Sequence, residues 1–67
     1  MSISYQKLWV FLAKNNMTKT QMRIQAQIST NVLARLGKGK TVSLESLMKI
    51  CQTLKCDIGD IVEYHAD

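Results

Sequence analysis

Residues 17–36 read MTKTQMRIQAQISTNVLARL, and this stretch sets the architecture that the rest of the chain completes. Thr18 is typical of a helix N-cap, because its hydroxyl can accept a hydrogen bond from an unpaired backbone N–H near Gln21. The pattern predicts a short helix over residues 19–25, a tight connection over 27–29, and a second short helix over 30–36 with Ser29 as its cap. Residues 37–39 end that second helix, since glycine tolerates the left-handed conformation of a helix C-terminus.

The apolar residues of this stretch are spaced to lock the two helices together. They are Met22, Ala26, Ile28, Leu33 and Leu36. The positions left pointing away from that core are Thr30, Asn31, Ala34 and Arg35. Because Arg35 falls one helical turn after Asn31, these side chains share one exposed face. Two short helices joined in this way are typical of a helix-turn-helix, whose second helix lies in the major groove of DNA while the first crosses the backbone.

The residue types on that exposed face fit the reading of base pairs. Asparagine pairs with adenine in bidentate fashion and arginine with guanine, and each such pair contributes about 1–3 kcal/mol of discrimination. Thr30, Asn31 and Arg35 are therefore the candidate base-reading residues.

A basic loop follows the second helix, with the sequence GKGKT at residues 37–41. Its spacing does not match a P-loop, which argues against nucleotide binding. Lysines just past a recognition helix suit contacts to DNA phosphates, and the backbone N–H groups of the loop could add to them. Lys19, at the start of the first short helix, would contact phosphates on the opposite flank.

Three further helices are expected outside this motif. The first begins near Ser4 and ends at the asparagines at 15 and 16, with Tyr5, Leu8, Trp9 and Leu12 in one buried stripe. Ser43 caps another, over residues 44–54, in which Leu44, Leu47, Cys51 and Leu54 share a face. Asp57 caps a final short helix through Ile58, Ile61 and Val62. The expected fold is all-α: one compact five-helix domain over residues 1–67.

Size and composition exclude several classes of protein. A chain of 67 residues has no room for a core and a deep substrate cleft, so we expect no enzyme. The longest apolar run, at residues 8–13, falls far short of the ~20 residues needed to cross a bilayer. No secretory signal is evident, and we expect a soluble, cytoplasmic protein.

Charge is distributed unevenly along the chain. Residues 1–44 carry seven basic and no acidic residues, whereas residues 45–67 carry two basic and all five acidic ones. The net charge of +4 therefore divides into +7 and −3. This separation indicates a face for an anionic partner; a solvated basic face without a partner is the alternative.

Sites for a metal, a cofactor or a small-molecule ligand are not expected. Cys51 and Cys56 lie five apart, and His65 is the one other soft ligand, so a four-ligand zinc site cannot be assembled. The cysteines are better explained as small core residues. The spacing of Asp57, Asp60 and Glu63 is explained by a capping aspartate and a solvated helix face.

The stretch at 17–36 resembles the Cro/phage-repressor (XRE-type) helix-turn-helix, with its lambda repressor-like DNA-binding domain. More closely, the chain is similar to short bacterial, phage and mobile-element regulators, through LGKG at 36–39 and CDIGDIVE at 56–63. The resemblance covers roughly residues 5–64. It implies base reading by Thr30, Asn31 and Arg35. The resemblance and the basic loop together imply phosphate contacts by Lys19, Ser29, Lys38, Gly39, Lys40 and Thr41.

Two positions depart from the family pattern. Gln27 stands where the turn usually has a glycine, so we expect it to adopt a left-handed conformation at some cost. Arg23 stands where a small residue is usual, and it could reach a phosphate or an acidic residue near the C-terminus. Both departures concern the geometry of the turn and leave the fold unchanged.

The leading hypothesis is a sequence-specific regulator, expected to be a repressor, that binds a double-stranded DNA operator as a homodimer. Two half-sites ~34 Å apart gain affinity from being linked, and burying Val62, Tyr64 or part of the first helix in a partner would stabilise a small core. The alternative is a protein-interaction module, such as an antitoxin or a mobile-element adaptor. RNA binding is a weaker option, because the four aromatic residues offer no evident stacking platform.

Overall fold

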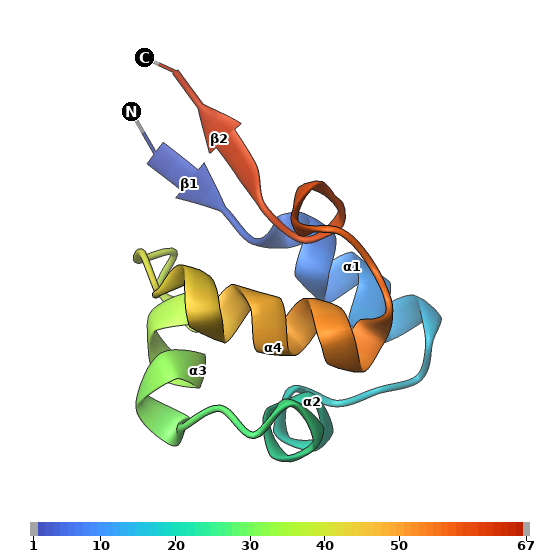
Figure 1. Ribbon diagram of the computed structural model, residues 1–67. Coiled ribbons are helices and arrows are strands. Elements are labelled where there is room, and N and C mark those ends of the chain that lie inside the picture. Colours follow the sequence, from blue (N-terminus) through green and yellow to red (C-terminus); the bar gives the residue numbers. More distant parts are fainter. Residues whose placement is uncertain (1, 67) are drawn as a thin grey trace.

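A computed structural model describes residues 2–66 of the chain. Its elements are β1 (Ser2–Ser4), α1 (Gln6–Lys14), α2 (Lys19–Ala26), α3 (Thr30–Gly37), α4 (Leu44–Leu54), the short 3-10 helix η1 (Ile58–Asp60) and β2 (Glu63–His65). In Figure 1, α4 crosses the middle of the molecule, α2 and α3 lie below it, and the two strands project together from the helical body. The fold is mostly helical and contains the expected helix-turn-helix.

Three hydroxyl side chains begin three of the helices, as the sequence predicts. Thr18 Oγ1 accepts from the backbone N–H of Gln21 at 3.0 Å, and the Gln21 side chain accepts from the N–H of Thr18 in return. Ser29 caps α3 and Ser43 caps α4 in the same way, each accepting at 3.1 Å. Each cap gives a hydrogen-bond acceptor to a helix-terminal N–H that would otherwise lack one, which favours a helix start at that point. The predicted starts of α2, α3 and α4 are confirmed.

The core forms where α4 packs across α2 and α1 supplies a third wall. Its fully buried side chains are Leu8, Met22, Leu36, Ile50 and Ile61. The expected buried face of α4 is wrong in one position. Leu44 is 60% exposed at the open first turn, whereas Ile50 is completely buried. The buried stripe of α4 keeps Leu47, Cys51 and Leu54 and includes Ile50 in place of Leu44.

The expected fifth helix is reduced to the three residues of η1, so the described chain has four α-helices. Asp57 does cap this turn: its carboxylate accepts from the N–H of Ile58 at 2.7 Å, and Asp60 accepts from the N–H of Asp57 at 2.9 Å. The turn cannot lengthen because the chain from Val62 onward leads into β2, where Glu63 pairs with Ser4.

The first helix begins at Gln6 rather than near Ser4, because residues 2–4 pair with the other end of the chain. The strands β1 and β2 are antiparallel, with Ser2 opposite His65, Ile3 opposite Tyr64 and Ser4 opposite Glu63. Ser4 also accepts from the N–H of Gln6 at 3.2 Å, which marks the point where strand gives way to helix. No helix within the described residues is long and apolar enough to cross a membrane.

Candidate DNA interface

The turn between α2 and α3 has the left-handed residue that the sequence predicts. Gln27 has φ 59° and ψ 41°, so a residue with a β-carbon occupies a conformation that favours glycine. The N–H of Ile28 donates to the carbonyl of Arg23 at 3.2 Å, and Ile28 itself is buried in the core. The turn thus reverses the chain and fixes the angle between α2 and α3 despite the missing glycine.

The outer face of α3 presents Thr30, Asn31 and Ala34 to solvent. On the opposite face, Leu36 is buried and Leu33 is half-buried against the core. This division places two of the predicted base-reading side chains, Thr30 and Asn31, side by side on the surface. Ala34 adds a small apolar side chain one turn further along.

Arg35 is placed differently from the other two predicted base-reading residues. Its side chain is half-buried, and its Nε donates to the carbonyl of Thr41 at 2.8 Å. One N–H of the guanidinium is therefore committed to the loop after α3. The terminal amino groups of the fork still offer donors to a base or phosphate.

Tyr5 holds the same loop from the core side. Its ring is 2% exposed, and its hydroxyl donates to the carbonyl of Lys40 at 2.8 Å. Burial raises the pKa of this phenol above its ordinary value, and the nearby charge of Arg35 offsets part of that rise. The helical spacing predicts Tyr5 as a core residue only. Its second role, as an anchor of the loop, has no local signal in the sequence because its partner lies 35 residues away.

The backbone N–H groups of the loop turn inward to α3. Lys38 donates to Ala34, Gly39 to Leu36, and Lys40 to Arg35 at 3.0 Å. Gly39 has φ 70°, a conformation that favours glycine and lets the chain leave the helix here. The idea that these three N–H groups are available for phosphates therefore lacks support. The exposed side chains of Lys38, Lys40 and Thr41 remain to make such contacts.

The opposite flank of the helix-turn-helix is formed by the start of α2. Lys19 is exposed, and its Nζ lies 4.3 Å from the centroid of the Trp9 ring. A cation over an aromatic face is attracted by the electrons of the ring, so this contact orients the lysine while its ammonium still faces water. Ser29 is also exposed, although its hydroxyl caps α3.

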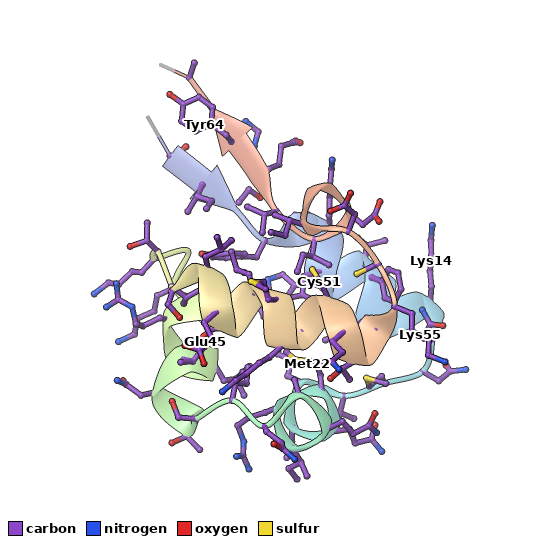
Figure 2. The ribbon with its side chains drawn as sticks, viewed as in Figure 1. Lys14, Met22, Glu45, Cys51, Lys55 and Tyr64 are labelled. Atoms are coloured by element: carbon purple, nitrogen blue, oxygen red, sulfur yellow. The ribbon has the colours of Figure 1, made fainter. Side chains whose placement is uncertain are left out.

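The terminal strands lie next to the loop. Ser2, Ile3 and Tyr64 form one side of an open hollow of about 520 Å³, and Arg35 with residues 39–41 forms the other. Tyr64 is 64% exposed, and Figure 2 shows its side chain on β2, away from the helical body. No local sequence pattern indicates that the two ends of the chain meet beside the loop that follows α3.

The cysteines have the character expected of core residues. Both are free thiols, half-buried near the end of α4. Burial raises the pKa of Cys51, and burial together with the neighbouring Cys51 raises that of Cys56 to about 11. Such thiols are poor nucleophiles and metal ligands at neutral pH. Within residues 2–66, no three His, Cys, Asp or Glu side chains gather as a metal site would require.

Comparison with known proteins agrees with this geometry. The model of the Cro/C1-type HTH DNA-binding domain matches residues 7–67. The chain belongs to this family. An uncharacterized HTH-type transcriptional regulator, YozG of Bacillus subtilis (strain 168), is 37% identical over 60 residues, which cover 87% of this chain and 71% of YozG. The crystal structure of the transcriptional regulator VanUg superposes with a TM-score of 0.90 at 44% identity, covering 92% of this chain and 83% of that one.

Family membership and these relatives place the chain among helix-turn-helix transcriptional regulators, a class of proteins that are not enzymes.

Proposed function

We propose that the protein binds a double-stranded DNA operator with α3 in the major groove. The observation that carries this proposal is the exposed outer face of α3, which lies between two anchored basic segments: Lys19 beside Trp9 and the loop at 38–41 tied by Tyr5 and Arg35. A recognition helix must be held in register by backbone contacts before its side chains can read bases. A lysine oriented by Trp9 on one flank and exposed lysines on a tied loop on the other suit that requirement.

Base reading is assigned to Thr30, Asn31 and Arg35. The Asn31 amide carries the donor and acceptor that match the major-groove edge of adenine, and the terminal amino groups of Arg35 match guanine. The hydroxyl of Thr30, in the first turn of α3, lies at the end of the helix that enters the groove.

Phosphate contacts are assigned to Lys19 and Ser29 on one flank and to Lys38, Lys40 and Thr41 on the other. Gly39, also in this set, contributes through the path it gives the loop, because its N–H is paired with Leu36. Such contacts position the protein without specifying sequence, and each neutralised phosphate makes binding more dependent on salt.

The regulator is proposed to act as a homodimeric repressor. One α3 reads only a few base pairs, and two copies on half-sites ~34 Å apart gain affinity because the second binding event becomes intramolecular. The exposed Tyr64 and half-buried Val62, on or beside β2, offer apolar surface that a second copy would cover. Occupying the operator would then block polymerase or a competing regulator.

The test is fluorescence anisotropy with an operator selected from random duplexes. Asn31→Ala and Arg35→Ala should each weaken operator binding by about 1–3 kcal/mol and change the preferred base at one position per half-site. Gln52→Ala, which alters an exposed polar residue on α4, is the matched control. If both variants at α3 bind the operator as tightly as the control, the assignment of base reading is wrong.

A further inference from the structure

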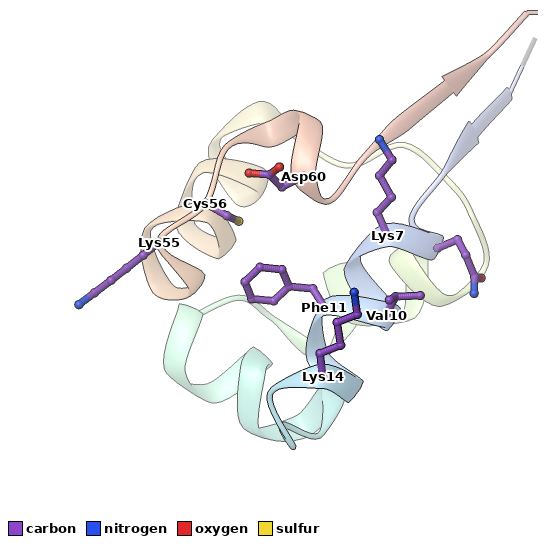
Figure 3. Close-up of a pocket in the computed structure, with 8 residues that line it drawn as sticks. Lys7, Val10, Phe11, Lys14, Lys55, Cys56 and Asp60 are labelled. Atoms are coloured by element: carbon purple, nitrogen blue, oxygen red, sulfur yellow. The ribbon is translucent and has the colours of Figure 1, made fainter.

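A second basic surface lies away from α3, where α1 meets the end of α4 and η1. An open hollow of about 480 Å³ occurs there, and Figure 3 shows its lining residues. Val10 and Phe11 form an apolar wall on α1, and Cys56 faces them from the end of α4. Val10 is 42% exposed, so this wall is open to a partner rather than closed by the core.

The rim of the hollow is positively charged. Lys7 and Lys14 rise from α1 on either side of Val10, and the stem of Lys55 borders the opposite edge with its ammonium directed outward. Lys7 is held at the rim because its Nζ donates to the carbonyl of Gly59 at 3.2 Å. The single acidic lining residue, Asp60, uses its carboxylate to accept from the N–H of Asp57.

These lysines stand apart from the proposed DNA interface. In Figure 2, Lys14 and Lys55 extend from the side of the molecule opposite to α3. The ion pair between Lys49 and Glu45 lies on α4 and does not involve the lysines of this hollow. The basic excess of the chain therefore supplies two faces, only one of which the helix-turn-helix uses.

We propose that this hollow docks an acidic segment of a partner protein, with one large apolar side chain placed against Val10 and Phe11. An apolar wall inside a cationic rim matches an apolar anchor flanked by carboxylates. The positive charge of the rim attracts an acidic segment and disfavours a basic one. Burial of the apolar anchor against Val10 and Phe11 stabilises the bound segment. A DNA duplex is a poor match, because it offers no protruding apolar group for the wall.

The experiment titrates short synthetic peptides into the ¹⁵N-labelled full chain and follows amide shifts by NMR. The probe has a central phenylalanine flanked by glutamates. One control peptide replaces the phenylalanine by alanine, and another replaces the glutamates by lysines. The expected result is saturable binding of the probe alone, with shifts centred on Val10, Phe11 and Cys56.

Protein variants separate this surface from the DNA interface. The double variant Lys14→Ala/Lys55→Ala should weaken probe binding roughly threefold to tenfold, because each exposed ion pair contributes modestly. Val10→Ser, which leaves the charges intact, should weaken it as well. Lys38→Ala, an exposed lysine beside α3, should leave probe binding unchanged. Operator affinity of the double variant should match the wild type, so failure here is distinguishable from failure of DNA binding.

Three outcomes would overturn the proposal. The first is the absence of a specific interaction with the hollow, shown either by no saturation at millimolar probe or by a double variant that binds the probe as tightly as the wild type. The second is a set of shifts centred on α3 and the loop, which would mean that the peptide merely imitates DNA. The third is a wild-type dimer that the double variant converts to a monomer in sedimentation, since a second copy would then be the occupant of the hollow.

Discussion

Replacing Tyr5 by phenylalanine tests whether the core anchors the loop that follows α3. The change keeps the buried ring and removes one hydrogen bond, from the hydroxyl to the carbonyl of Lys40 at 2.8 Å. A neutral hydrogen bond contributes about 0.5–1.5 kcal/mol net to folding. The hydrogen bond is only part-buried, so water can replace the lost donor, and we expect a loss of about 1 kcal/mol. For a domain of this size that corresponds to a fall in Tm of roughly 4–8 °C.

The same variant should weaken binding to every DNA sequence alike. Freeing the Lys40 carbonyl lets the loop at 38–41 sample more conformations, and ordering it on DNA then costs additional entropy. The outer face of α3 and the Arg35–Thr41 hydrogen bond do not involve Tyr5, so the ratio of specific to non-specific affinity should stay constant. Gln52→Ala is the control, because this exposed residue of α4 lies outside the loop and the proposed dimer surface and should alter neither stability nor the loop.

The dependence on pH gives this prediction a second readout. Burial raises the pKa of Tyr5 above its ordinary value near ~10. A pKa that is higher in the folded state means that the stabilisation is complete below the unfolded pKa and is lost as pH rises through the folded one. The advantage of the wild type over Tyr5→Phe should therefore shrink above about pH 10.

Urea unfolding followed by circular dichroism, at neutral pH and near pH 10.5, measures this difference directly. All other titratable groups are common to both proteins and cancel in the comparison. Equal stability of the wild type and Tyr5→Phe at neutral pH would refute the anchoring role. A gap that stays constant with pH would refute the argument from burial.

Three further predictions follow from single residues. Gln27→Gly should raise the free energy of unfolding, measured by urea titration, by about 0.5–1 kcal/mol, because glycine adopts φ 59° without strain. An unchanged unfolding midpoint would contradict the cost assigned to this turn. Lys38→Ala should weaken binding to all sequences and reduce the slope of log affinity against log salt by about one unit, whereas an unaltered slope would remove this lysine from the phosphate contacts. Cys56, with its pKa near 11, should react with iodoacetamide at pH 8 at least ~10-fold more slowly than the same cysteine in the urea-unfolded chain; equal rates would show that burial does not protect it.

The helix-turn-helix was predictable because its signals are local. Thr18, Ser29 and Ser43 each pair with an N–H three residues ahead, so a short window of sequence contains both partners. The left-handed conformation of Gln27 was expected from the family resemblance, because the usual turn has a glycine at this position. Such contacts depend little on the rest of the fold.

The terminal strands were not predictable in the same way. Each has only three residues, and its partner lies at the far end of the chain. The first helix is therefore expected to begin near Ser4 until the pairing of Ser4 with Glu63 is known. The same pairing shortens the expected fifth helix to η1, because residues beyond Val62 are needed for β2.

Arg35 shows how a candidate base-reading residue acquires a second role from tertiary structure. Spacing along α3 places it one turn after Asn31, but its Nε hydrogen bond to Thr41 is set by the path of the loop. A guanidinium presents its donors as a rigid planar fork, so fixing Nε against a carbonyl also fixes the directions of the terminal amino groups. A lysine at this position could not be oriented in this way, since its ammonium has no second fixed edge. Arg35 therefore ties the loop as well as facing outward from α3, and Arg35→Lys should loosen the loop and weaken the proposed base contact together.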